Sequence, residues 1–119
     1  MQPTGVHHVS INVGDVAESV RFYTEVLGLE LRADRPDDLG VDGVWLDAGD
    51  QQVHLILAGT PNGLGQHFAL AVDDLDAAVA ELRSGTIAVS DPSSVGAGRQ
   101  SFLVDPSGNL VELHQPATR

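Results

Sequence analysis

The sequence predicts an α+β fold in which two pseudo-symmetric βαβββ modules form a curled mixed sheet around a trough. The first supporting observation is a faint internal repeat, because like residues recur 59 positions apart, as in His8 with His67 and Asp15 with Asp74. The second is that, in each half, a stretch of alternating apolar residues precedes a stretch with helical spacing and three more alternating stretches. Two copies are too few for a solenoid, so paired modules are expected.

The length of 119 residues is that of one domain, and 42% hydrophobic residues are enough for a core. We therefore expect a single domain over residues 1–119. Within it, module one covers residues 6–58, module two covers residues 66–114, and the glycine-containing stretch 59–65 links them.

Module one is expected to begin with a strand, because Val9, Ile11 and Val13 alternate with polar residues. Asp15 is a suitable N-cap for the helix that follows, with Glu18 three residues further on. An apolar stripe continues that helix, and Gly28 is the type of residue that ends one. Three strands complete the module, at 29–34, 43–47 and 52–58, with a turn at 48–50.

Module two repeats this order. A strand begins at His67, and Asp74 is the expected cap of a helix with an apolar stripe formed by Leu75, Val79 and Leu82. Three strands are predicted at 86–90, 99–104 and 109–114, and the Asp-Pro-Ser-Gly turn at 105–108 joins the last two. The loops 35–42 and 91–98 are rich in Pro, Gly, Asp and Ser.

Composition excludes several classes of protein. The absence of cysteine excludes disulfides, thiolate ligands and a cysteine nucleophile. The sequence has no run of about 18 apolar residues, so no membrane span is expected. The N-terminus lacks the pattern of a signal peptide. A cytoplasmic location is therefore expected. Seventeen acidic residues against six arginines give a net charge of −11, which disfavours nucleic acid and anionic membranes as partners.

Four side chains on the strands are typical metal ligands. If strands alternate as predicted, His8, His54, His67 and Glu112 all lie on the face opposite the helices. A single histidine at such a place is more often a structural residue, but four placed by an internal repeat favour a shared site. Three imidazoles and one carboxylate suit Zn²⁺, Ni²⁺, Co²⁺, Mn²⁺ or Fe²⁺ better than Ca²⁺ or Mg²⁺.

Other residues have two interpretations each. His114 shares the face of Glu112, so it either supports a metal ligand from outside or lines a substrate pocket, or it is an exposed residue at a strand end. Trp45 either packs in the fold or lines the trough, and Arg99 either contacts an anionic substrate or lies on the surface. His7 is expected on the face opposite His8, away from the ligands.

Three stretches carry a family resemblance: HHVSINVGDVAESVRFYTEVLGLEL, HFALAVDDLDAAVAELR and FLVDPSGNLVELHQP. Together they resemble the vicinal oxygen chelate superfamily, which includes glyoxalase I, bleomycin resistance proteins, fosfomycin resistance enzymes and extradiol dioxygenases. The resemblance implies the glyoxalase-like fold, a homodimer and a small-molecule ligand bound through neighbouring oxygens. It also implies a divalent metal at His8, His54, His67 and Glu112, with Glu112 as the catalytic base.

One position departs from the pattern of glyoxalase I-like members, because His54 stands where these commonly have Glu or Gln. The resemblance favours a metal-dependent lyase or isomerase of the glyoxalase I type. One alternative is a sequestering resistance protein of the bleomycin-binding type, with or without metal. Another is a fosfomycin-type thiol transferase using His8, His67 and Glu112, although that activity needs a cationic pocket.

Overall fold

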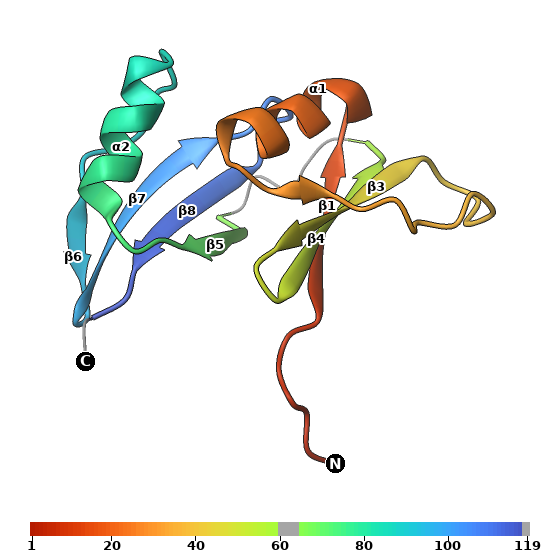
Figure 1. The fold of residues 1–119 in the computed structure, drawn as a ribbon, viewed down its shortest axis with the longest axis horizontal. Helices are drawn as coiled ribbons and strands as arrows, with labels where there is room; N and C mark the ends of the chain where they lie inside the picture. Colours follow the sequence, from red (N-terminus) through yellow and green to blue (C-terminus); the bar gives the residue numbers. More distant parts are fainter. Residues whose placement is uncertain (60–64, 118–119) are drawn as a thin grey trace. The chain divides into compact units, whose positions relative to one another are not determined.

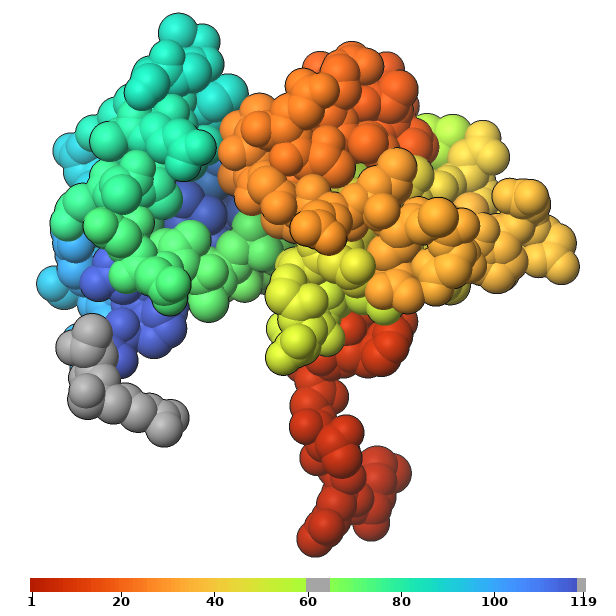
Figure 2. Space-filling model, in the orientation of Figure 1, coloured from red at the N-terminus to blue at the C-terminus, as the bar shows by residue number. Residues whose placement is uncertain are grey.

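The computed structural model describes residues 1–59 and 65–117 of the chain. It divides into two compact units, Met1–Pro61 and Asn62–Arg119, which are described separately below. Most of the expected linker, residues 60–64, lies outside the described residues. The first six residues are exposed and extend away from the sheet of unit 1 (Figures 1 and 2).

Unit 1 is a four-stranded sheet with the strand order β1-β4-β3-β2. The first and last strands of the unit, β1 and β4, pair in parallel, and the other neighbours are antiparallel. A short α-helix continues directly into a π-helical turn between β1 and β2. The elements are β1 (His8–Val13), α1 (Val16–Arg21), η1 (Phe22–Val26), β2 (Glu30–Leu31), β3 (Gly43–Ala48) and β4 (Gln51–Leu57).

Unit 2 has the same topology, with the strand order β5-β8-β7-β6 and parallel pairing of β5 with β8. One longer helix, α2, lies against β7 and β8 (Figure 1). The predicted α+β fold of two βαβββ modules is therefore confirmed. The elements are β5 (His67–Ala71), α2 (Leu75–Ser84), β6 (Ser93–Val95), β7 (Gly98–Val104) and β8 (Leu110–Gln115).

Both helices begin where an aspartate satisfies a free backbone N–H group. The Asp15 carboxylate accepts from the backbone N–H of Glu18 at 2.9 Å, and that of Asp74 accepts from Ala77 at 3.0 Å. After η1 the chain leaves the helical path at Gly28, whose φ of +77° suits a residue without a Cβ. The two caps fix the direction in which each chain segment leaves its first strand.

Each helix lies against the strands of its own sheet. The buried apolar residues of these segments are Phe22 and Tyr23 of η1, after α1, and Leu75, Val79 and Leu82 of α2. In unit 1, Tyr23 of η1 and the strand residues Leu46 and Leu55 are completely buried. In unit 2, Leu75 of α2 and Val111 of β8 are completely buried. Burial of this kind supplies most of the stability of a small domain. The opposite face of each sheet carries the alternate side chains of the strands, which include the predicted metal ligands.

The predicted strand at 86–90 is wrong, and β6 forms later, inside the predicted loop 91–98. Thr86 has a φ of +63°, and the N–H of Ile87 still bonds to the carbonyl of Leu82, so this segment closes the end of α2. Ser90 then makes two bonds to Phe102 of β7, one through its N–H and one through its hydroxyl. Alternating apolar residues alone do not reveal such a helix end.

The predicted turn at 105–108 is built around a buried carboxylate. Asp105 is 4% exposed, and its side chain accepts from the backbone N–H groups of Ser107 and Asn109 and from the side-chain amide of Asn109. The turn therefore fixes how β8 follows β7. None of the helices in residues 1–59 and 65–117 is long and apolar enough to cross a membrane.

Candidate functional site

The predicted ligand residues of unit 1 lie on the face of the sheet opposite α1, as alternation predicts. In the observed register His54 is paired with Ser10 of β1 and Trp45 of β3, and His8 is paired with Gln52. The ring of His8 stacks on that of His54, with centroids 4.0 Å apart. The ring of Trp45 stacks on His54 at 4.7 Å. Because β4 lies between β1 and β3, the His54 ring has an aromatic neighbour on both sides.

The contacts of His54 determine its protonation state as well as its position. Its Nε2 donates to the side-chain oxygen of Gln52 at 2.8 Å, so the lone pair of the neutral ring is on Nδ1. The residue is 9% exposed. This burial lowers the pKa of His54, and nearby positive charge, first that of His8, lowers it further. His54 is therefore a neutral imidazole, the form that binds a metal ion.

His7 lies just before β1 and is exposed. Its backbone carbonyl accepts from the N–H of Gln52, and its ring meets that of His8 edge to face at 5.2 Å. The Nδ1 atoms of His7 and His8 are 2.9 Å apart, so one of them donates to the other. His7 is therefore a direct neighbour of the predicted ligand His8.

In unit 2 the central feature is the carboxylate of Glu112, which is only 8% exposed. Glu112 is paired with Ala69 and Phe102 on the face opposite α2. Its Oε1 lies 3.1 Å from Nε2 of His67, and its Oε2 lies 2.9 Å from Nδ1 of His114. A buried carboxylate is costly unless it is paired, and both of its oxygens have an imidazole partner.

The surroundings of His67 favour its protonated, cationic form. Its Nδ1 lies 2.9 Å from the backbone carbonyl of Gly65, and its Nε2 faces the Glu112 carboxylate. Because a carbonyl and a carboxylate oxygen accept hydrogen bonds, both contacts favour a proton on the ring nitrogen. The bond to Gly65 raises the pKa of His67, and the bond and charge of Glu112 raise it further. The ring of Phe102 meets His67 edge to face at 5.4 Å.

The imidazole nitrogens and the carboxylate of the predicted ligands suit a borderline divalent metal ion such as Zn²⁺. Two ligands that bind one ion at about 2.1 Å and at right angles are about 3.0 Å apart, and Nε2 of His67 is 3.1 Å from Oε1 of Glu112. An ion could therefore replace the Nε2 proton with little movement of either side chain. The four predicted ligands form two pairs, one in each unit. Among the described residues, no three side chains of the His, Cys, Asp and Glu types are grouped to hold a metal ion.

The other predicted site residues do not all lie on the same face of their sheets as the predicted ligands. Trp45 and His114 lie on the ligand faces, against His54 and Glu112 respectively. Arg99 lies on the opposite face of its sheet, because it shares the alternation of the buried Ser101 and Leu103. Its guanidinium makes a two-point ion pair with Asp76 of α2, at 2.9 and 3.0 Å.

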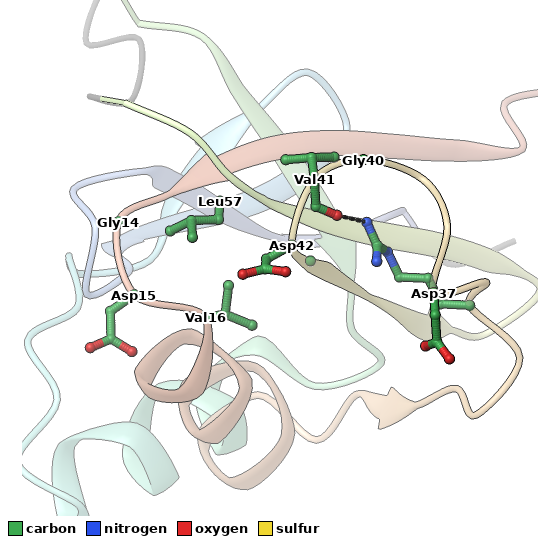
Figure 3. Close-up of a pocket in the computed structure, with 10 residues that line it drawn as sticks. Gly14, Asp15, Val16, Asp37, Gly40, Val41, Asp42 and Leu57 are labelled. Atoms are coloured by element: carbon green, nitrogen blue, oxygen red, sulfur yellow. Dashed lines mark hydrogen bonds between the residues drawn. The ribbon is translucent and has the colours of Figure 1, made fainter.

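Unit 1 also has an open pocket of about 890 Å³ at the carboxyl ends of β1 and β4 (Figure 3). Its walls combine the carboxylates of Asp15, Asp37 and Asp42 with the apolar side chains of Val16 and Leu57. The Arg35 guanidinium, which also lines it, donates to the carbonyl of Val41 at 2.8 Å. The lining includes none of the predicted metal ligands.

Sequence reasoning missed two of these features. Gln52 had a detectable signal, because it lies two residues from His54 and on the same face of a strand. The pocket had only a weak one, since the loop 35–42 that forms one wall was recognisable by composition alone. The contact between His114 and Glu112 follows the same two-residue spacing as that between Gln52 and His54.

Comparisons with known proteins agree with this architecture. A model of the Glyoxalase/Bleomycin resistance protein/Dioxygenase superfamily matches residues 5–113. A Vibrio cholerae protein named "Probable lactoylglutathione lyase" is 30% identical over 121 residues, covering 91% of this chain and 88% of that protein. Among solved structures, a Bacillus anthracis protein assigned by name to the glyoxalase family has a TM-score of 0.85 at 28% identity, with 97% of each chain covered. TnmS3, an antibiotic binding protein from a Streptomyces species, has a TM-score of 0.80 at 32% identity, covering 98% of this chain and 99% of its own.

Proposed function

Because the chain belongs to the Glyoxalase/Bleomycin resistance protein/Dioxygenase superfamily, we propose that it is a divalent-metal-dependent lyase or isomerase. Its substrate is a small molecule chelated through two neighbouring oxygens. The observation that carries this proposal is the buried Glu112 carboxylate, paired with His67 on the sheet face that α2 leaves uncovered. A buried acid beside an imidazole is a typical functional arrangement.

In this proposal the metal ligands are His8, His54, His67 and Glu112. A bound divalent ion would act as a Lewis acid towards the substrate oxygens. Glu112 is the general base, because it is the carboxylate of the set. Trp45 offers an aromatic surface beside His54 for the body of the substrate.

A second candidate is a protein that binds an antibiotic or a metabolite without converting it. The likeness to TnmS3, at 32% identity over nearly the whole of both chains, favours it. The acidic charge of −11 would attract a cationic ligand. The two candidates differ in the metal, since sequestration requires no Lewis acid.

The test begins with the metal content of the purified protein, followed by chelation and separate reloading with Zn²⁺, Ni²⁺, Co²⁺, Mn²⁺ and Fe²⁺. The reloaded forms are assayed by NMR against a panel of small hydroxy-carbonyl and dicarbonyl compounds. We expect turnover that is lost on chelation and restored by one of these ions. No measurable affinity for any of the five ions would contradict the enzyme proposal, and ligand binding that survives chelation would favour sequestration.

We also propose a cytoplasmic homodimer. The strands β1 and β5 lie at the edges of their sheets, and an exposed edge favours pairing with another strand. The exposed Leu31 and Val104 add apolar surface. Light scattering at micromolar concentration measures the mass directly, and the mass of a single chain would contradict the dimer.

A further inference from the structure

The carboxylate of Glu112 has two oxygens with different partners. Oε1 faces Nε2 of His67 at 3.1 Å, and Oε2 faces Nδ1 of His114 at 2.9 Å. His67 and Glu112 are both proposed metal ligands, so their direct contact is the one that an ion would replace. The contact with His114 involves the other oxygen and can remain. We propose that His114 is the positioning residue of Glu112, which fixes the carboxylate so that Oε1 is presented to the metal ion.

The local geometry makes this assignment specific. His114 follows Glu112 by two residues on β8, so both side chains project from the same face of the sheet. Since a carboxylate oxygen only accepts, the proton of this contact is on Nδ1 of His114. A hydrogen bond from a fixed ring to one carboxylate oxygen limits rotation about the last side-chain bond of Glu112.

The ring of His114 is accommodated by a glycine on the neighbouring strand. A Cβ placed on Gly98 would lie 3.1 Å from Nε2 of His114, closer than carbon and nitrogen normally approach without a bond, and 2.7 Å from the carbonyl oxygen of Gln115. Because Gly98 has no side chain, the ring of His114 has room beside the first residue of β7. This explains how a large side chain fits near a strand end without turning away from Glu112.

Unit 1 has a similar arrangement on β4, the strand that corresponds to β8. There Gln52 contacts His54 at 2.8 Å, also across two residues and also on the face opposite the helix. In both units, the proposed ligand on the last strand is thus held by a polar side chain of the same strand. Outer partners of this kind orient metal ligands, and their loss typically lowers metal affinity about 10–100-fold.

The inference rests on the proposed metal site, and the experiment separates the two. Affinities for Zn²⁺ and Co²⁺ are measured by chelator competition in the wild type, His114→Leu and His114→Asn. Leucine has a similar size but no donor, whereas the asparagine amide nitrogen can take the position of Nδ1. We expect about a 10–100-fold loss of affinity in His114→Leu and recovery of most of it in His114→Asn.

The visible absorption of the Co²⁺ form provides a second readout, because it depends on the number and geometry of the ligands. We expect it to change in His114→Leu, where Oε2 is free to approach the ion, and to return in His114→Asn. Equal affinities and spectra for the wild type and His114→Leu would overturn the positioning role while leaving the metal site intact. Failure of the wild type to bind either ion would overturn both.

Discussion

Nε2 of His67 lies 3.1 Å from Oε1 of Glu112, whose carboxylate is almost completely buried, and the pKa of His67 is raised there, first by the backbone carbonyl of Gly65 and then by Glu112. The proton on Nδ1 of His67 is fixed by the Gly65 carbonyl, so the charge of the ring does not depend on Glu112 alone. The pair joins the first strand of unit 2 to its last. Because folding changes the pKa of His67, the pair makes the stability of the unit dependent on pH.

The first prediction concerns this pH dependence in the metal-free protein. The pKa of His67 is raised in the folded state, first by Gly65 and then by Glu112, so folding favours the charged ring. The resulting stability is fully present below the unfolded pKa of about 6.5 and is lost as pH rises through the raised folded pKa. In urea unfolding, the advantage of the wild type over His67→Gln should shrink over that window. An advantage that grows with pH would contradict the assignment.

The second prediction concerns the identity of the ligands. Replacing His67 by Ala or Glu112 by Gln should lower metal affinity more than the roughly 10–100-fold expected when an outer partner is lost. His7→Ala is the matched control for His8→Ala, because the two rings are adjacent and only His8 stacks on His54. If His7→Ala removes the metal while His8→Ala retains it, the ligand assignment on β1 is off by one residue.

The third prediction uses Trp45 as a reporter. It is the only tryptophan of the chain, and its ring stacks on His54 at 4.7 Å. Metal binding through His54 changes the charge and electronic structure next to the indole, so we expect its fluorescence to change in a saturable titration. Co²⁺ or Ni²⁺ should quench it. In His54→Ala the change should be much smaller at equal metal occupancy, and an unchanged response would remove His54 from the site.

The fourth prediction is weak or absent lactoylglutathione lyase activity, despite the names of several relatives. Glutathione has carboxylates that need cationic contacts, and Arg32, Arg83 and Arg99 are each paired with an aspartate. Imidazole at position 54 also leaves one fewer carboxylate to move a proton. An assay with methylglyoxal and glutathione across several metals tests this, and activity gained only in His54→Glu would support it. Robust turnover by the wild type would disprove it.

The fifth prediction compares two completely buried serines. The hydroxyl of Ser101 has no hydrogen-bond partner within the described part of the chain, whereas that of Ser19 donates to the Asp15 carbonyl at 2.7 Å. An unsatisfied buried polar group costs about 1–3 kcal/mol, and a typical bond contributes about 0.5–1.5 kcal/mol. Ser101→Ala should therefore raise the free energy of unfolding, and Ser19→Ala should lower it. If urea unfolding showed the same loss in the free energy of unfolding for both variants, the Ser101 hydroxyl would have a hydrogen-bond partner in solution.

Sequence patterns were most informative where one local rule decided the structure. The caps at Asp15 and Asp74, the turn at 105–108 and the face of each predicted ligand all follow from residue type and alternation. The segment 86–90 did not, because Thr86 adopts a left-handed conformation that its residue type disfavours. The π-helical turn after Arg21 has no comparable signal, since its apolar residues also suit an α-helix.

The face of each candidate ligand could be predicted from the sequence, but its contacts could not. His8, His54, His67 and Glu112 were predicted from strand alternation, the internal repeat and the family resemblance, whereas the raised pKa of His67 depends on the Gly65 carbonyl. The orientation of Glu112 depends on which oxygen His114 reaches. Such details are determined by side-chain conformations and by a backbone group from a connecting segment, and neither has a periodic signature.

The parallel pairing of the first and last strands in each unit affects how the protein folds during synthesis. The strand made last, β4 or β8, is inserted between strands that were made earlier. Neither sheet can be completed until the end of its unit has left the ribosome, and such non-local pairings form slowly. His54 and Glu112 lie on these late strands, so the contacts of each with its neighbours form only after the last strand of its unit has been made.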